Sequence, residues 1–300
     1  MERTMRRMID LLLASWLAFG ATASARDLDD IRREGVLRHL GVPYAHFVTG
    51  SGDGLDVELI QGFARDLGVR YEFVQTDWPH MFGDLTGQNA RLDGDQVERF
   101  GETPIRGDLI ANGLTVLGWR KQVVRYSEPT FPSGVWLITR AASPLHPIKP
   151  SGELENDIRA TKASLNGVSV LASANSCLDP DLYQLDQTGA DIRLAPEERT
   201  PDELIPALFN QDAETSLMDV STTLLSLERW PGEIKVLGPI SEQQTMAVGF
   251  RPDSPQLLAA FNDYLARVKA DGSYPRTVKK YFPAMFDYFP NFFGEGGASK

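Results

Sequence analysis

The sequence has a single cysteine, Cys177, and four scattered histidines among its 300 residues. One cysteine excludes an internal disulfide. The histidines form no HxxxH or HxxEH pair, so the sequence indicates no metal site and no cofactor. The GxSxG, Walker and GxGxxG patterns are also absent, which removes the usual sequence signs of hydrolases and of nucleotide- and dinucleotide-binding proteins. We therefore assign no catalytic residue.

Basic residues are fewer than acidic residues. Lysine and arginine total 30 against 41 aspartate and glutamate residues, for a net charge of −11. Phosphate backbones are bound by clusters of basic side chains, and the sequence contains none. We expect no nucleic-acid partner, and we interpret the acidic surface as a feature that keeps the protein soluble.

Long apolar runs are missing too. The longest, residues 11–21, is shorter than the ~20 residues of a membrane-spanning helix. Three arginines precede it and Ala23-Ser24-Ala25 follows it, which is the arrangement of a secretory signal peptide over residues 1–25, cleaved before Arg26. A transmembrane anchor is the alternative. We expect a periplasmic protein, because Cys177 lies too far from the signal to carry a lipid.

After residue 25, apolar segments of strand type alternate with segments of helix type, which predicts an α/β protein. A polar stretch at 87–107 is left without an assignment. The expected strands are 36–42, 69–74, 109–110, 135–139, 168–172, 192–195, 216–218 and 234–237. The expected helices are 56–67, 179–187, 200–210 and 221–227.

The segment 107–129 has the composition of an anion site. A short apolar strand leads to a small-residue turn at Asn112-Gly113, then to Thr115 and Arg120. Free amides, a hydroxyl and a guanidinium within eight residues suit a carboxylate, because the guanidinium can hold two oxygens at once. We expect a small acid to bind here.

This segment resembles the anion site of the family 3 extracellular solute-binding proteins, in which a threonine or serine is followed five positions later by arginine and then by an aromatic-Ser-x-Pro sequence. Here these positions are Thr115, Arg120 and Tyr126 to Pro129, although Gly118-Trp119 replaces the family's usual Pro-Glu. Further matching segments are 41–47, 54–59, 165–170, 269–274 and 279–282.

The resemblance implies a type II periplasmic binding protein, in which two lobes are joined by two crossing strands and enclose a ligand cleft. Residues 26–133 with 248–300 would form lobe 1, and residues 134–247 would form lobe 2. The resemblance also implies that Arg120 clamps a ligand carboxylate, assisted by Thr115 and the amides near Gly113. A surface salt bridge is the alternative for Arg120. Three aromatic residues are candidates for ligand contact, with core packing as the alternative: Tyr44, Phe47 and Trp78.

From lobe 2 the resemblance implies three further ligand contacts. Ser176 and Cys177 stand at the family's hydroxyl positions, after a strand and at the expected head of a helix. Asp219 matches the carboxylate that pairs with a ligand ammonium, and its alternative role is the N-cap of the helix that follows. Arg120 and Asp219 on opposite lobes would suit a zwitterion.

The resulting hypothesis is a monomeric periplasmic protein that binds a small amino acid or a related carboxylate and delivers it to an inner-membrane ABC permease. The run 54–67 also resembles the solute-binding module of lytic murein transglycosylases. The alternative is therefore an envelope module that binds a cell-wall peptide, with no cleavage activity of its own. A cyclohexadienyl dehydratase-like enzyme, with Glu214 or Asp219 as general acid, and an interaction role with a degenerate cleft are further alternatives.

Overall fold

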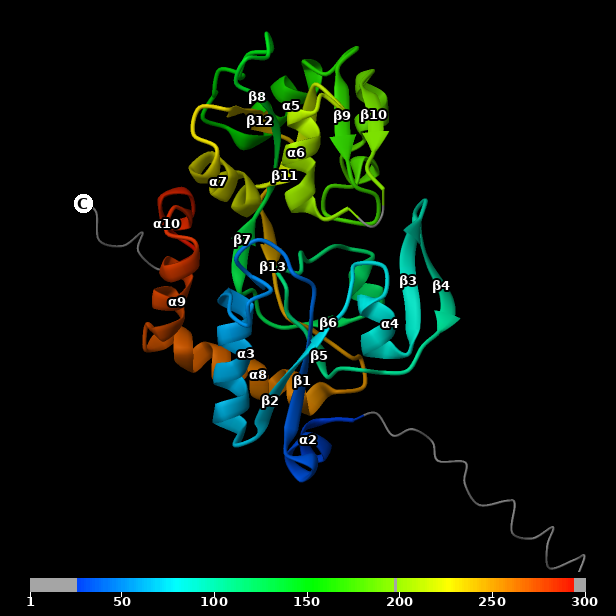
Figure 1. The fold of residues 1–300 in the computed structure, drawn as a ribbon, viewed down its shortest axis with the longest axis vertical. Coiled ribbons are helices and arrows are strands. Elements are labelled where there is room, and N and C mark those ends of the chain that lie inside the picture. Colours follow the sequence, from blue (N-terminus) through cyan, green and yellow to red (C-terminus); the bar gives the residue numbers. More distant parts are fainter. Residues whose placement is uncertain (1–25, 197–198, 294–300) are drawn as a thin grey trace, which may run out of the picture.

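The computed structural model describes residues 26–196 and 199–293. The expected signal peptide at 1–25 lies outside these residues. Figure 1 shows two lobes stacked along the long axis, each built around its own sheet of five strands. We call the lobe that contains the first strand lobe 1 and the other lobe 2.

The sheet of lobe 1 has the order β2-β1-β5-β14-β6. Strand β1 is almost fully buried and runs parallel to β2 and β5, whereas β14 is antiparallel to β5 and β6. The bounds are β1 (Val36–Gly41), β2 (Arg70–Gln75), β5 (Leu109–Ile110), β6 (Arg125–Tyr126) and β14 (Gly249–Phe250).

Helices cover both faces of this sheet. The apolar stripe of α3, at Leu59, Ile60 and Phe63, has helical spacing and packs into a core shared with α8 and α9. The short α4 covers the other face, where its Phe82 meets Ile110 of β5. The bounds are α2 (Leu28–Glu34), α3 (Leu55–Leu67), α4 (Met81–Thr86), α8 (Pro255–Ala270) and α9 (Ser273–Tyr281).

The sheet of lobe 2 has the order β10-β9-β11-β8-β12. Strands β9, β10 and β11 are parallel, and β8 is antiparallel to its neighbours β11 and β12. The strands are β8 (Val135–Arg140), β9 (Ser169–Ala172), β10 (Asp191–Leu194), β11 (Thr215–Asp219) and β12 (Ile234–Pro239). The helices are α5 (Leu154–Ala163), α6 (Leu204–Phe209) and α7 (Val220–Arg229).

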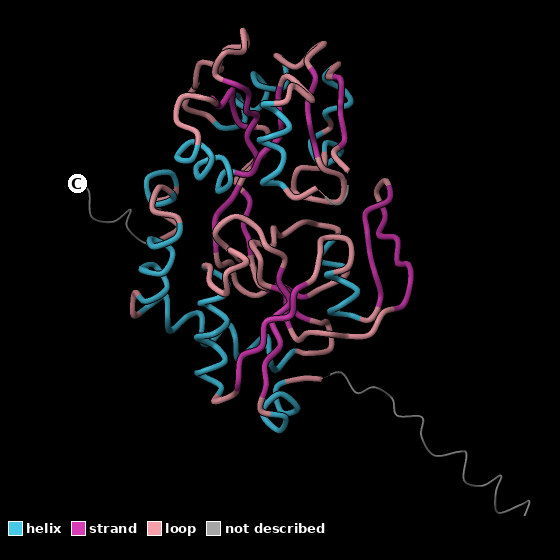
Figure 2. The backbone as a smooth tube through the Cα atoms, in the orientation of Figure 1, coloured by secondary structure: helices cyan, strands magenta, loops and turns pink. Residues whose placement is uncertain are grey.

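Two short strands, β7 (Phe131–Ser133) and β13 (Gln244–Met246), pair antiparallel and connect the lobes. These are the two expected crossing strands. Figure 2 shows that loops, rather than helices or strands, occupy most of the junction beside them. The last helix, α10 (Met285–Tyr288), lies at the level of this junction. Within the described residues, no helix is both long and apolar enough to cross a membrane.

The structure differs from the sequence prediction in three segments. The segment expected as one helix, 179–187, forms two 3₁₀ turns, η3 (Pro180–Tyr183) and η4 (Leu185–Thr188), because Gln184 between them takes a left-handed conformation with φ 54°. The unassigned stretch 87–107 contains a hairpin of β3 (Gln88–Asp93) and β4 (Gln96–Glu102). The helix expected at 200–210 begins with a 3₁₀ turn, η5 (Pro201–Glu203).

Candidate ligand site between the lobes

Arg120 is a buried cation in a 3₁₀ turn, η2 (Arg120–Gln122), and only 2% of its surface is exposed. Its Nη1 donates to the Thr115 carbonyl at 3.2 Å and its Nη2 donates to the Asn175 carbonyl at 3.2 Å. Its Nε has no hydrogen-bond partner. No ion pair within the described part of the chain includes Arg120. The guanidinium also lies over the rings of Trp119 and Phe82, at 5.3 and 5.8 Å from their centroids. Carbonyls and rings leave its charge without an anion, so it retains its capacity to bind one.

Thr115 lies directly beside Arg120. Its side chain lowers the pKa of the Cys177 thiol, and its carbonyl also accepts from Tyr126. The amide of Gly113, by contrast, donates to the Asp56 carboxylate at 2.6 Å, so it is not free to bind a ligand as expected. Gly113 has φ 67°, and a Cβ there would lie 2.6 Å from the Phe47 ring, so only glycine fits.

The three aromatic candidates have different positions. Phe47 is fully buried in the lobe 1 core against Phe131 and Phe282, which corrects its expected ligand contact to core packing. Tyr44 stacks on Phe47 and reaches lobe 2 through its hydroxyl. Trp78 meets the Tyr44 ring edge-on, and its buried Nε1 has no hydrogen-bond partner. Tyr44 and Trp78 therefore lie at the junction, and Phe47 packs against Tyr44 from the core of lobe 1.

Asp219 is the residue of lobe 2 that contacts Tyr44. The Tyr44 hydroxyl donates to its Oδ2 at 2.5 Å, and the other oxygen accepts from the Ser221 hydroxyl and from the Thr222 amide at 2.9 Å. Asp219 is therefore the N-cap of α7, as one reading expected, and at the same time faces lobe 1. Burial, and then the charge of Asp219, raise the pKa of Tyr44, so this phenol stays protonated and remains a donor.

Ser176 and Cys177 do not head a helix, because the next turn, η3, begins only at Pro180. The Ser176 hydroxyl bonds within its own loop, donating to the Ser173 carbonyl and accepting from the Leu178 amide, and its expected ligand contact stays a prediction. The charges of both Arg120 and Asp219 act on the Cys177 thiol. Its pKa is raised to about 11, mainly by burial and then by the charge of Asp219, while the charge of Arg120 acts in the opposite direction.

Sequence reasoning missed several residues of this junction. Tyr183 donates to the Cys177 carbonyl at 2.5 Å and accepts from Gln244 of β13 at 3.0 Å. The remaining oxygen of Gln244 and both amide atoms of Asn112 are buried without partners. Asn112 lies in the segment 107–129, just after a short strand, and this position was its only signal in the sequence. The full burial of its side chain is seen only in the structure. Tyr183 and Gln244 had none, because they reach the site through tertiary packing.

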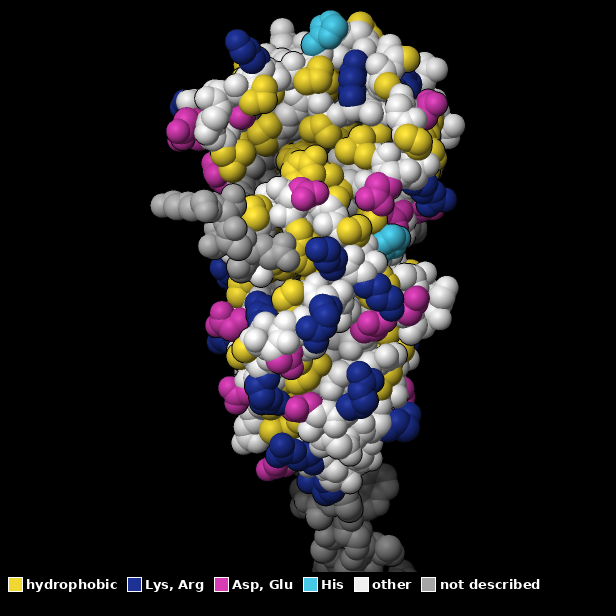
Figure 3. Space-filling model, turned by 90° about the vertical axis from the view of Figure 1, so that its left-hand side faces the viewer, with side chains coloured by type: hydrophobic (Ala, Val, Ile, Leu, Met, Phe, Trp, Pro, Cys, Tyr) yellow, Lys and Arg dark blue, Asp and Glu magenta, His cyan; other side chains and the backbone are white. Residues whose placement is uncertain are grey.

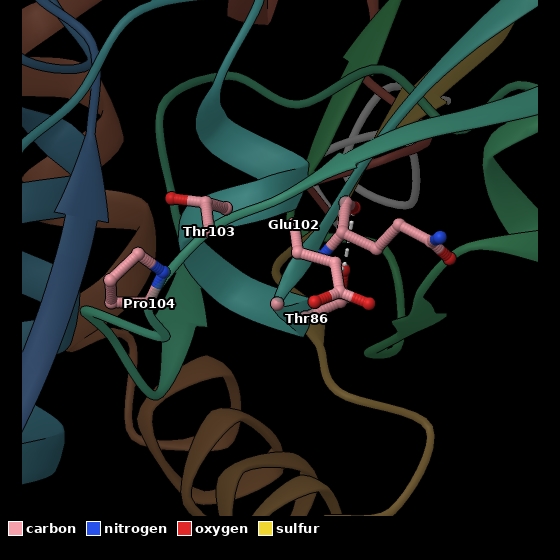
Figure 4. A pocket seen from close by; sticks show the side chains of 6 residues that line it. Thr86, Glu102, Thr103 and Pro104 are labelled. Atoms are coloured by element: carbon pink, nitrogen blue, oxygen red, sulfur yellow. Dashed lines mark hydrogen bonds between the residues drawn. The ribbon is translucent and has the colours of Figure 1, made fainter.

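The two cavities outlined in the structure lie outside this junction. One, of about 500 Å³, lies between the end of α4 and the hairpin (Figure 4) and is lined by Thr86, Gly87, Gln88, Glu102, Thr103 and Pro104. The other, of about 330 Å³, lies between α3 and the α8–α9 corner. Between the lobes, contacts such as the Tyr44–Asp219 hydrogen bond hold the two surfaces together.

Comparison with known proteins decides the family. Residues 105–284 match the model of the bacterial extracellular solute-binding proteins, family 3. The chain belongs to this family. The family 3 chain is 26% identical over 96% of its length to membrane-bound lytic murein transglycosylase F of Desulfosudis oleivorans, but it spans only 59% of that relative. It is 24% identical to the L-cystine-binding protein TcyJ of Escherichia coli, over 78% of this chain and 76% of that protein.

Solved structures agree on the fold of this family 3 protein. A mutant of ArgBP from T. maritima superposes with a TM-score of 0.66 at 20% identity, over 85% of this chain and 99% of that one. The chain therefore has the two-lobed type II periplasmic-binding-protein fold.

Proposed function

We propose that this protein captures a small amino acid or a related carboxylate between its lobes in the periplasm and delivers it to an inner-membrane ABC permease. In this proposal the lobes divide just after each crossing strand, with 26–133 and 248–300 in lobe 1 and 134–247 in lobe 2. The protein acts as a monomer without a cofactor or a catalytic residue. Family membership and the amino-acid-binding relatives support solute binding.

One observation carries the proposal. Arg120 is 98% buried and, within the described residues, has no acidic partner. Burying an unpaired charge is costly, and proteins normally pair such a group. A ligand carboxylate would supply the missing anion and would meet the unpartnered Nε.

The opposite charge supports a zwitterion as the ligand. Arg120 belongs to lobe 1 and Asp219 to lobe 2, and both charges act on the Cys177 thiol, where Asp219 raises the pKa and Arg120 lowers it. Asp219 accepts from three donors, and a carboxylate has about four acceptor positions, so one remains for an ammonium group. Arg120 and Asp219 would then hold the two ends of an amino acid.

The test is a thermal shift of the refolded, ligand-stripped protein against a panel of amino acids that includes L-cystine and L-arginine. A ligand at a hundredfold over its Kd adds about 2.7 kcal/mol, which corresponds to a shift of roughly 5 to 10 °C for a chain of this size. Arg120→Met should abolish the shift while leaving the ligand-free Tm equal or higher, because it removes a buried, unpaired charge. Arg159→Met, at an exposed arginine, is the matched control and should keep the shift.

The second candidate is an envelope module that binds a cell-wall peptide, favoured by the match to the lytic transglycosylase over nearly the whole chain. The same panel therefore includes short murein peptides. A shift with a murein peptide and none with any free amino acid would replace transport by this function. If no compound of either class shifts the Tm, both proposals are wrong.

A further inference from the structure

The β3–β4 hairpin is the part of lobe 1 that the proposed function leaves without a role. It lies outside the five-stranded sheet, and Figure 1 shows it extending from α4 toward lobe 2 beside the junction. Its strands pair from Gln88 with Glu102 to Asp93 with Gln96. A hairpin of two strands is only marginally stable alone, so contacts with the rest of the protein must fix its position.

The hairpin contacts lobe 2 through Asn175. The backbone amide of Leu92, in β3, donates to the Asn175 side-chain oxygen at 2.8 Å. Asn175 has φ 59°, a left-handed conformation that asparagine adopts more readily than most residues. Its backbone amide donates to the Asp179 carboxylate at 2.7 Å. Contacts within the loop of lobe 2 therefore fix the position of Asn175, independently of the hairpin.

The same residue contacts Arg120. The backbone oxygen of Asn175 accepts from Arg120 Nη2 at 3.2 Å, while Nη1 of that guanidinium is held by the Thr115 carbonyl at 3.2 Å. Asn175 thus accepts two hydrogen bonds from lobe 1, one from the hairpin and one from the arginine. A movement of the hairpin relative to lobe 2 would shift Asn175 and, with it, one of the two contacts that orient the guanidinium.

We propose that the β3–β4 hairpin and Asn175 form a clasp that holds the lobes closed and that Asn175 is a positioning residue acting through Arg120. The clasp lies on the Arg120 side of the junction, and the Tyr44–Asp219 hydrogen bond joins the lobes on the Asp219 side. Only the effect on the ligand rests on the proposed function, because the contact between the lobes exists without a ligand. The clasp must break before the lobes can open. A variant without the clasp should therefore have a faster rate of ligand dissociation and an unchanged rate of association.

Two substitutions at Asn175 separate its side chain from its backbone. Asn175→Gly keeps the left-handed backbone and the carbonyl that Arg120 contacts, but removes the oxygen that Leu92 contacts. Asn175→Asp keeps that oxygen and should behave like the wild type. A third variant shortens the hairpin by replacing residues 91–98 with Asn-Gly, a sequence that favours a two-residue turn between Ala90 and Arg99, which lie opposite each other.

The closed state is measured without any amino acid, from the distance between two spin labels, one at Gln187 in lobe 2 and one at Asp263 in lobe 1. The labels are attached to ketone-bearing residues introduced at these two positions, so that Cys177 stays unmodified. The wild type and Asn175→Asp should share one distance distribution, and Asn175→Gly and the shortened hairpin should add a longer distance. Identical distributions in all four proteins would overturn the clasp. A longer distance in the shortened hairpin alone would overturn the role of Asn175.

The ligand arm uses L-cystine and L-arginine as probes in stopped-flow mixing. For a probe that binds the wild type, Asn175→Gly should dissociate about fivefold faster, the order of magnitude for one lost hydrogen bond, and Asn175→Asp should restore the wild-type rate. An unchanged dissociation rate overturns the effect on the ligand. If the wild type binds neither probe and no other amino acid, the proposed function fails, whereas the distance measurement still decides the clasp.

Discussion

At the scale of single residues, the two charges of the site are satisfied to different degrees. Arg120 keeps an unpartnered nitrogen, whereas Asp219 accepts hydrogen bonds from Tyr44, Ser221 and Thr222. The arginine is therefore the group that most requires a ligand. Asp219 has two functions, as the cap of α7 and as a contact between the lobes.

Tyr44→Phe tests that contact between the lobes. It removes the donor to Asp219 but keeps the ring packed on Phe47 and Trp78, so the fold should persist. We expect a loss of about 1.5 to 3 kcal/mol in the free energy of unfolding, the range for a hydrogen bond to a charged group. Urea denaturation measures it. Tyr288→Phe, at a half-exposed ring, is the control and should change nothing; an equal effect of both variants would contradict the assignment.

Asp56 gives the protein a second property at this scale, a dependence of stability on pH. Burial raises the pKa of Asp56 to about 7, so the folded chain keeps a proton that the unfolded chain releases above about pH 4. Its contribution to stability is therefore full below pH 4 and is lost as the pH rises to about 7. Asp56→Asn does not titrate and still offers an oxygen to the Gly113 amide.

The difference in unfolding free energy between the wild type and Asp56→Asn should therefore fall by up to about 4 kcal/mol between pH 4 and pH 7, at about 1.4 kcal/mol per pKa unit. Urea titrations of both proteins across this range measure it. His39, which burial keeps neutral with a pKa of about 4, is present in both proteins, so its opposite pH dependence cancels in the comparison. A constant difference would show that Asp56 does not titrate in this range.

At the scale of elements, the sequence predicted most sheet strands and the helices α3 and α7 well, because their apolar residues recur with a clear period, but it gave no bounds for the longest helix, α8. α3 is an example: its predicted bounds, 56–67, differ by one residue from those observed. The prediction failed where a local signal competed with packing, as at 179–187, where Gln184 breaks a helix-like pattern. The hairpin had a signal that we did not use, because Asp93-Gly94 between alternating residues is typical of a tight turn.

Substitution of Gly94 tests that turn. Gly94 has φ 57° and no atom near an added Cβ, so only backbone strain opposes a side chain. Gly94→Val should cost the hairpin about 1 to 2 kcal/mol, whereas Gly94→Asn should cost little, because asparagine tolerates this conformation. Hydrogen exchange of the hairpin amides should be faster in Gly94→Val alone. Equal exchange in the two variants would mean that the turn does not limit hairpin stability.

At the scale of the whole molecule, charges of both signs share one face. On the face in Figure 3, the lysine and arginine side chains of lobe 1 are interspersed with aspartate and glutamate. The site shows the limit of prediction at this scale: a local motif pointed to Arg120, but its partner Asn175 is 55 residues away and meets it across the junction between the lobes.

The C-terminal segment, residues 285–293, makes a further connection between the lobes, in addition to the two crossing strands. Phe293 contacts Phe131 of the crossing strand β7, and Tyr288 stacks at a tilt on Trp136 of β8 in lobe 2. In the same segment, Met285 and Phe286 are buried in the core that contains Phe131. The segment therefore covers the point at which the chain crosses from lobe 1 to lobe 2.

Deletion of residues 285–300 should lower the free energy of unfolding by more than about 3 kcal/mol, because loss of one buried methionine or phenylalanine side chain already costs 2 to 5 kcal/mol. Urea denaturation, read from the midpoint and the slope, measures this loss. Tyr288→Ala is the matched control: its ring is 54% exposed, so the loss should stay below about 1 kcal/mol. An unchanged midpoint in the truncated protein would show that the aromatic segment rests on the junction without stabilising it.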